Sequence, residues 1–265
     1  MKTELPRALV EIRYHKEAQD YLRKLPLEHF MEATPQATQR KITLESLDLV
    51  QARRPDFQVF NELLVQYPLP RKKRPGQVVP DNMVVLHDKP IKAEGSYDLP
   101  LQPVGPFWML EYVSKGTRRK DYDDNMRRYE HELKVPYYLL FAPNEQELTL
   151  YRHTGERYVS VMPDDQGRCA IQEVEIGVGL LDGWVRFWYQ GELLPLPADL
   201  MHALDATRQK LADMTRRAEA EFNRAEAEFN RAEAAMLRAE NEKQTRLAAE
   251  RELQELRAQR NRTND

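Results

Sequence analysis

Proline and glycine are both absent from Asp199 to about Arg260, a stretch in which alanine, glutamate, arginine and leucine dominate. Proline and glycine are the residues that most disfavour a helix interior, whereas the four common residues all favour it. The sequence therefore predicts a long C-terminal helix over residues 198–262. The preceding Leu196-Pro197 marks the end of the part that can fold into a globular domain.

The predicted helix contains a seven-residue repeat, because Arg-Ala-Glu-Ala-Glu-Phe-Asn at 217–223 recurs at 224–230. Apolar residues at this spacing are typical of the a and d rows of a coiled-coil seam, and glutamates at e and g would face each other in a parallel homodimer. A single solvated helix, an antiparallel pair and a seam for a different partner all stay open. We expect a homo-oligomer or a partner helix through residues 200–260. The a row is Phe222, Phe229 and Met236, the d row is Leu204, Leu211, Ala218, Ala225, Ala232 and Ala239, and the flanking glutamates are Glu219, Glu221, Glu226, Glu228, Glu233 and Glu240.

The overall composition excludes several classes of protein. The formal net charge of −3 argues against a globally basic nucleic-acid binder, but it allows a local basic patch. Cys169 is the only cysteine, so an intramolecular disulfide and a cysteine-based metal site are both excluded. The sequence has no apolar stretch of about 20 residues and no apolar signal-peptide core near its start. We therefore expect a cytoplasmic protein with no membrane partner.

Helical and strand-like patterns are mixed before Pro197, so the fold class is predicted to be α/β or α+β. An irregular leader over residues 1–35, with at most a short helix around 15–25, precedes the domain at 36–197. The patterns within that domain predict a helix over 36–53, a strand over 57–67, a Pro/Gly-rich loop over 87–105, a helix over 120–133, a strand over 137–141, a hairpin of 148–152 with 157–162, and a last strand over 185–189.

Two apolar runs, at 78–86 and 106–114, each carry one carboxylate, Asp81 and Glu111. Both runs read as strands, and a carboxylate in such a run is costly to bury unless it is paired or binds a cation. Carboxylates on neighbouring strands can share one divalent ion, and Mg²⁺ prefers one or two of them together with water and phosphate oxygens. The pair therefore suggests metal-assisted phosphodiester hydrolysis. The alternative is that each carboxylate caps a turn at a strand end.

The ordered set of motifs resembles the Uma-type restriction endonuclease family of the restriction-endonuclease-like, PD-(D/E)xK superfamily. The resemblance covers roughly residues 35–190 and implies an α/β fold in which a mixed central sheet is flanked by helices. It also implies an endonuclease that acts on DNA with Mg²⁺ or Mn²⁺, with Asp81 and Glu111 as catalytic metal ligands. The matching elements are Pro80-Asp81, Glu111-Tyr112-Val113-Ser114, the basic segment 117–121, Tyr129 and the apolar strand that follows it.

The lysine of the superfamily pattern is the point at which this sequence departs from it. Two residues after the glutamate stands Val113, and Asn125 occupies the helix position at which Uma-type proteins place a lysine. Lys115 and Lys120 are the candidates to supply the positive charge instead. The superfamily often uses a further acidic residue, for which Glu45 and Glu62 are candidates; the alternative for both is a solvated or salt-bridged carboxylate.

Basic residues near the acidic pair are candidates for contacts with DNA phosphates, which give affinity without sequence specificity. Arg118 and Arg119 follow Glu111, and Arg71 and Lys72 precede Asp81; a solvated loop is the alternative for the latter two. A rival function is a non-catalytic scaffold that keeps the nuclease fold and acts through its C-terminal helix. The aromatic residues expected in the core rather than at a site are Trp108, Tyr112, Tyr137 and Tyr138.

Overall fold

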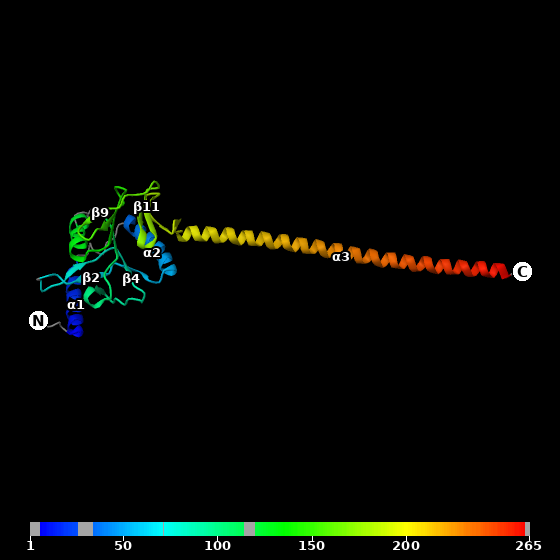
Figure 1. The fold of residues 1–265 in the computed structure, drawn as a ribbon, viewed down its shortest axis with the longest axis horizontal. Helices are drawn as coiled ribbons and strands as arrows, with labels where there is room; N and C mark the ends of the chain where they lie inside the picture. The colour runs from blue at the N-terminus through cyan, green and yellow to red at the C-terminus, as the bar shows by residue number, and fades with distance from the viewer. Residues whose placement is uncertain (1–5, 26–33, 71, 114–119, 263–265) are drawn as a thin grey trace. The chain divides into compact units, whose positions relative to one another are not determined.

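The computed structural model describes residues 6–25, 34–70, 72–113 and 120–262, without the side chains of residues 120, 121 and 254–262. The chain divides into two compact units, Met1–Ala198 and Asp199–Asp265. The first unit is a mixed α/β domain, and the second is formed by most of one long helix (Figure 1).

A six-stranded mixed sheet runs through the described part of the first unit in the order β1-β4-β6-β7-β8-β9. Strands β6 and β7 are parallel, and the other neighbours are antiparallel. Every residue of β6 and β7 is buried, because both faces of the sheet are covered at its centre. The mixed central sheet predicted from the sequence is therefore confirmed. The strands are β1 (Phe57–Asn61), β4 (Asn82–Leu86), β6 (Trp108–Tyr112), β7 (Tyr137–Ala142), β8 (Glu147–His153) and β9 (Tyr158–Ser160).

One face of the central sheet is covered by helix α2 (Thr34–Arg53) and an antiparallel sheet in the order β10-β11-β12-β13. Leu47 and Val50 of α2 belong to the same buried apolar cluster as Trp108 of β6. The Gln39 side chain also joins the two covering elements, since it donates to the Val185 carbonyl at 3.1 Å and accepts from the Val185 amide at 2.8 Å. The strands, with one short helix, are β10 (Arg168–Ile171), η5 (Gln172–Val174), β11 (Ile176–Leu181), β12 (Trp184–Tyr189) and β13 (Glu192–Leu193).

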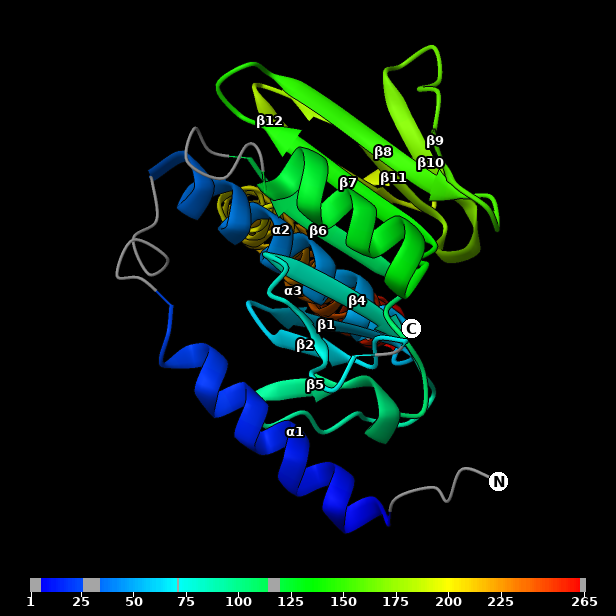
Figure 2. The same ribbon diagram turned by 90° about the vertical axis from the view of Figure 1, so that its left-hand side faces the viewer.

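The opposite face of the central sheet is covered by the helix over 120–133 and by a three-stranded sheet in the order β3-β2-β5 (Figure 2). The helix is wound mostly with i→i+5 hydrogen bonds, a rare winding that occurs often at functional sites. It ends at Lys134, whose φ of 51° leaves the helical region. These elements are β2 (Leu64–Tyr67), β3 (Gly76–Val78), β5 (Ser96–Asp98), the short helix η2 (Leu99–Leu101), η3 (Lys120–Asn125) and η4 (Arg128–Leu133).

Helix α1 (Arg7–Leu22) packs on this smaller sheet through Tyr14 and Ala18 (Figure 2). Two strand glutamines bind its backbone: Gln66 Nε2 donates to the Tyr14 carbonyl at 2.9 Å, and Gln77 Nε2 donates to the Glu17 carbonyl at 3.1 Å. The irregular leader predicted for residues 1–35 is therefore wrong over these residues. The helix is longer than the short one expected around 15–25, and tertiary contacts hold it.

Two single strands predicted from apolar patterns are each divided between two sheets. The predicted strand 57–67 separates into β1 and β2 at Glu62, whose φ of 48° turns the chain. The apolar run 78–86 separates into β3 and β4 around Pro80-Asp81, because proline cannot donate to a strand ladder. The loop expected over 87–105 contains β5, and β13 follows the strand predicted to be the last.

The second unit consists of helix α3 (Pro197–Arg262), which begins in the last residues of the first unit. The predicted long C-terminal helix is therefore confirmed. Among the described residues, none of the helices combines the length and the apolar character that crossing a membrane requires.

Candidate active site

Asp81 and Glu111 lie side by side at one end of the β4–β6 pair. The register places Asn82 opposite Leu110, so its continuation by one residue places Asp81 opposite Glu111. The Asp81 amide donates to Glu111 Oε2 at 3.3 Å, and the Tyr112 amide donates to Asp81 Oδ2 at 2.6 Å. The structure thus brings together the two carboxylates that the sequence placed on neighbouring strands.

Glu111 is buried, with 2 % of its surface exposed, and its carboxylate receives hydrogen bonds from side chains of the helix over 120–133. Asn125 Nδ2 donates to Glu111 Oε1 at 2.9 Å, and the Tyr129 hydroxyl donates to the same oxygen at 2.7 Å. Asn125 and Tyr129 are both fully buried and lie four residues apart on the helix over 120–133. Hydrogen bonds donated to a carboxylate favour its charged form and fix its orientation.

The Tyr112 side chain points to the other face of β6 and anchors the strand to α2. Its hydroxyl lies 2.7 Å from both Thr43 Oγ1 and Asn82 Oδ1, while Gln36 Nε2 donates to its carbonyl at 3.0 Å. Burial raises the pKa of the Tyr112 hydroxyl above its ordinary value, and the charges of Asp81 and Glu111 raise it further. Tyr112 is therefore a neutral structural residue, as the sequence predicted for the core aromatics Trp108, Tyr112, Tyr137 and Tyr138, which are all buried.

Arg40 of α2 is a basic residue at this end of the sheet that sequence reasoning missed. Arg40 Nη2 lies 2.7 Å from Glu62 Oε1, and the Glu62 amide donates to the Asp81 carbonyl at 3.2 Å. The guanidinium also lowers the pKa of the Tyr112 hydroxyl, opposing Asp81 and Glu111. Helix periodicity located α2 but gave no signal that this residue approaches the acidic pair.

The two candidates for a third acidic residue are both in ion pairs. Glu62 is next to Asp81 in space and is paired with Arg40. Glu45 pairs instead with Lys41, whose Nζ lies 3.8 Å from Glu45 Oε1. Both residues therefore form the kind of salt bridge that the sequence analysis gave as the alternative to a role as a third acidic residue of the site.

The superfamily's lysine position and the Uma-type lysine position, at Val113 and Asn125, both carry uncharged residues. Val113 is buried, and it packs in the same apolar cluster as Met109, Tyr129 and Tyr138. Asn125 binds Glu111 through its amide. The candidates Lys115, Arg118, Arg119 and Arg71 lie outside the described residues; Lys120 begins η3, but its side chain is not among those described.

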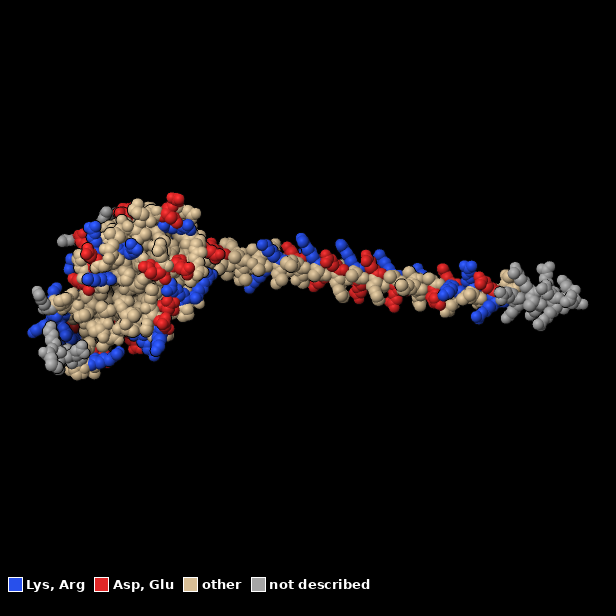
Figure 3. Space-filling view, in the orientation of Figure 1, with Lys and Arg blue, Asp and Glu red and all other residues tan. Residues whose placement is uncertain are grey.

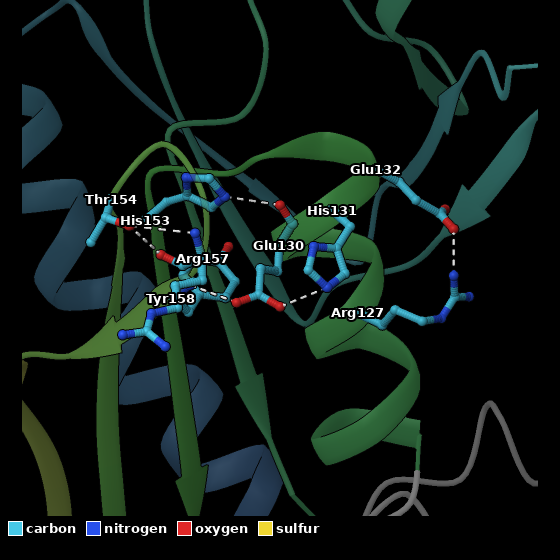
Figure 4. Close-up of polar contacts among 8 residues, drawn as sticks. All are labelled: Arg127, Glu130, His131, Glu132, His153, Thr154, Arg157 and Tyr158. Atoms are coloured by element: carbon cyan, nitrogen blue, oxygen red, sulfur yellow. Dashed lines mark hydrogen bonds and ion pairs between the residues drawn. The ribbon is translucent and has the colours of Figure 1, made fainter.

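Polar contacts attach the C-terminal part of the helix over 120–133 to the β8–β9 hairpin (Figure 4). Glu130 Oε1 accepts from the Tyr158 amide at 2.6 Å, and Glu130 Oε2 lies 3.0 Å from His131 Nε2. His153 Nδ1 accepts from the Gly155 amide, so Nε2 carries the proton and donates to the Glu130 carbonyl at 2.9 Å. These bonds hold the helix that presents Asn125 and Tyr129 to Glu111.

A cluster of basic residues lines a cavity of about 270 Å³ between the helix over 120–133 and the β2–β3 hairpin. Lys72, Arg127 and Arg128 contribute the positive charges. Arg127 Nη1 donates to Glu132 Oε1 at 2.7 Å, and the Tyr67 hydroxyl donates to Glu132 Oε2 at 2.6 Å. The structure therefore joins Lys72, which was predicted to contact nucleic acid, to two arginines that the sequence did not single out.

The acidic pair fits a hard divalent cation. Mg²⁺ and Mn²⁺ prefer oxygen ligands, and Mg²⁺ commonly takes one or two carboxylates together with water and phosphate oxygens. The two donors on Glu111 Oε1 fix the orientation of this carboxyl group, as the outer-shell partners of a metal ligand do. Across the residues that the structure describes, no group of three or more His, Cys, Asp or Glu side chains is placed to hold a metal ion.

Comparison with known proteins gives one family and a distant structural neighbour. The model of the family Uma2, described as "Putative restriction endonuclease", matches residues 30–180, more than half of the chain. A solved structure of a "putative nuclease belonging to DUF820" from Anabaena variabilis is similar at 16% identity and a TM-score of 0.38, over 49% of this chain and 69% of that one. No curated protein matches.

Proposed function

The chain belongs to the Uma2 family, and from that premise we propose that it is a divalent-metal-dependent endonuclease that hydrolyses phosphodiester bonds in DNA. One observation carries the proposal: Asp81 and Glu111 lie opposite each other at a strand end, with Glu111 held by Asn125 and Tyr129. A buried carboxylate with dedicated donors is costly to maintain for stability alone, whereas a metal ligand requires such support.

Asp81 and Glu111 would hold Mg²⁺ or Mn²⁺. Such an ion, when bound, lowers the pKa of a coordinated water and neutralises charge on phosphate. Asn125 and Tyr129 fix the direction of the Glu111 carboxyl group, and Arg40 holds Glu62 beside the Asp81 backbone. Lys115 and Lys120 are proposed to add positive charge at the reacting phosphate.

DNA would reach the acidic pair along basic residues. Arg118 and Arg119 are proposed to contact phosphates next to the site, together with Arg71 and Lys72 near β3. The cavity lined by Lys72, Arg127 and Arg128 supports this path, because the helix that carries Asn125 and Tyr129 also carries both arginines. Phosphate contacts of this kind would give salt-dependent affinity without sequence specificity.

A non-catalytic scaffold is the second candidate, and one observation favours it. Val113 is buried among apolar side chains, and the Asn125 amide is engaged with Glu111, so neither lysine position of the pattern can supply charge. On this reading the acidic pair is a remnant of the catalytic site, and the protein acts through α3.

Metal titration and cleavage separate the two candidates. Calorimetry with Mn²⁺ should show one site that Asp81→Asn and Glu111→Ala each remove, while Glu45→Gln, a matched change on α2, leaves it intact. Nicking of plasmid DNA with Mn²⁺ should depend on the same two residues. Mn²⁺ binding without cleavage of plasmid or single-stranded DNA would favour the scaffold. Absence of Mn²⁺ binding to a folded wild type would overturn the nuclease proposal.

A further inference from the structure

Helix α3 lies outside the segment that matches the Uma2 family, and it exposes an apolar stripe. Phe222, Phe229 and Met236 recur every seven residues and are 68 %, 69 % and 75 % exposed. Alanines at 218, 225, 232 and 239 separate these large side chains along the same face. The alanines would let another helix approach closely, with its side chains packed between the phenylalanines.

The two flanks of this stripe differ in charge. On the g flank, Glu221 and Glu228 have arginines at helical contact spacing, since Arg224 is three residues after the first and four before the second. On the e flank, Glu226 and Glu233 have neither Lys nor Arg three or four residues away in the helix. Their neighbours at those spacings are asparagine, phenylalanine, methionine and leucine. Glu226 and Glu233 therefore form an acidic row on the e flank that their own helix does not neutralise, whereas Glu219 has Arg216 and Glu240 has Lys243 three residues away. Acidic and basic side chains are interspersed along α3 as a whole (Figure 3).

Self-pairing does not satisfy this row. In a parallel pair the g flank of one helix faces the e flank of the other, and in an antiparallel pair equivalent flanks face each other. Glutamate occupies e at 219, 226, 233 and 240 and g at 221, 228 and 242, and neither flank has a basic residue in this stretch. Both orientations would therefore place glutamate against glutamate, which opposes a second copy as the occupant.

We propose that the face of α3 formed by Phe222, Phe229 and Met236 docks an amphipathic helix of another protein, which has an apolar heptad seam and Lys or Arg recurring every seven residues along one flank. The apolar seam would cover the phenylalanines, and the basic flank would pair with Glu226 and Glu233. Because these pairs lie beside an apolar contact, they would select the partner by charge while burial supplies most of the affinity.

Two synthetic four-heptad peptides test the proposal on the full-length chain. Both have Leu at a and d; one has Lys at e and g, and the other has Glu there. In calorimetry at low salt, the Lys peptide should bind with one peptide per chain, and binding should weaken as NaCl is added. The Glu peptide should bind at least about tenfold more weakly, because of like-charge repulsion. No binding of the Lys peptide, or equal binding of both peptides, would overturn the proposal.

Matched variants locate the contact. Glu226→Gln with Glu233→Gln should weaken Lys-peptide binding about fivefold, since two exposed ion pairs are lost. Glu221→Gln with Glu228→Gln removes the same charge from the neutralised flank and should weaken binding less. Phe222→Ala with Phe229→Ala should weaken it on the order of a hundredfold, with unchanged helix content by circular dichroism. Equal losses from the two glutamine pairs would contradict the assignment of the e flank.

Sedimentation velocity checks the competing occupant. The full-length chain alone should sediment as a monomer at tens of micromolar. A dimer that Phe222→Ala with Phe229→Ala converts to a monomer would identify a second copy as the occupant and overturn the proposal.

Discussion

The Tyr129 hydroxyl donates a 2.7 Å hydrogen bond to Glu111 Oε1, although the two residues are 18 positions apart in the chain. Tyr129 belongs to the helix over 120–133, and Glu111 belongs to the strand that this helix covers. The bond therefore ties the position of the helix to the orientation of the proposed metal ligand.

Tyr129→Phe should lower the free energy of unfolding by about 1–3 kcal/mol, because it removes a hydrogen-bond donor from a buried carboxyl oxygen. Urea unfolding at pH 7 measures the change. Tyr122→Phe removes a hydroxyl that lies 3.3 Å from Glu147 Oε2 at an exposed position, and it should cost less than about 0.5 kcal/mol. Equal effects of the two variants would show that the bond to Glu111 has no special weight.

Asn125→Lys should raise the Mn²⁺-dependent rate of plasmid cleavage on the order of a hundredfold if a missing positive charge limits the reaction. The new ammonium would replace the amide that now binds Glu111. Asn125→Met, which is similar in length but uncharged, is the control and should give no increase. A Lys variant that is folded and no faster than wild type would place the limitation elsewhere.

Gly76→Ala should destabilise the first unit by about 1–3 kcal/mol through overpacking. A Cβ atom at Gly76 would lie 2.4 Å from the ring of Tyr67, which is 1 % exposed and bonded to Glu132. Gly105→Ala is the matched control, since its Cβ would meet Leu99 at 3.6 Å, an ordinary contact. Thermal unfolding compares the two; equal melting temperatures would mean that the Tyr67 ring moves at little cost.

Tyr97 should make the free energy of unfolding fall as pH rises above 10. Burial raises the pKa of the Tyr97 hydroxyl from 10.0 to about 12. The pKa of Tyr97 is higher in the folded state than in the unfolded state, so the folded state favours the protonated hydroxyl. The contribution of Tyr97 to the free energy of unfolding is therefore fully present below pH 10 and is lost as pH rises from 10 to about 12. Tyr97→Phe lacks the bond to the Val104 carbonyl but cannot ionise, so the stability gap to wild type should narrow over that range. Urea unfolding at several pH values checks this, and a constant gap would contradict it.

Truncation after Ala198 should leave the first unit with an unchanged melting temperature, because both of its apolar cores are built from residues before 198. Circular dichroism should show a large loss of helix, corresponding to α3. Sedimentation velocity should show a monomer for the truncated chain, as it should for the full-length chain. A truncated chain that is unfolded would mean that α3 supports the domain.

Much of the architecture could be predicted because it depends on local signals. The absence of proline and glycine after Pro197 predicted α3, and helical periodicity predicted α2 and the helix over 120–133. Apolar runs located β4, β6 and β7, and with them the two strands that bring Asp81 and Glu111 together. These patterns reflect burial on one or both faces of an element, which is a property of a short stretch of chain.

Tertiary structure decided the rest, since it depends on which distant residues meet. A period-two pattern does not show where a strand leaves one sheet for another, so the break at Glu62 between β1 and β2 had no local signal. Arg40 and Asn125 likewise owe their places at the acidic pair to the packing of two helices on opposite faces of one sheet. The sequence by itself determined the two strand carboxylates, Asp81 and Glu111, and the packing of the helices on the sheet determined which side chains surround them.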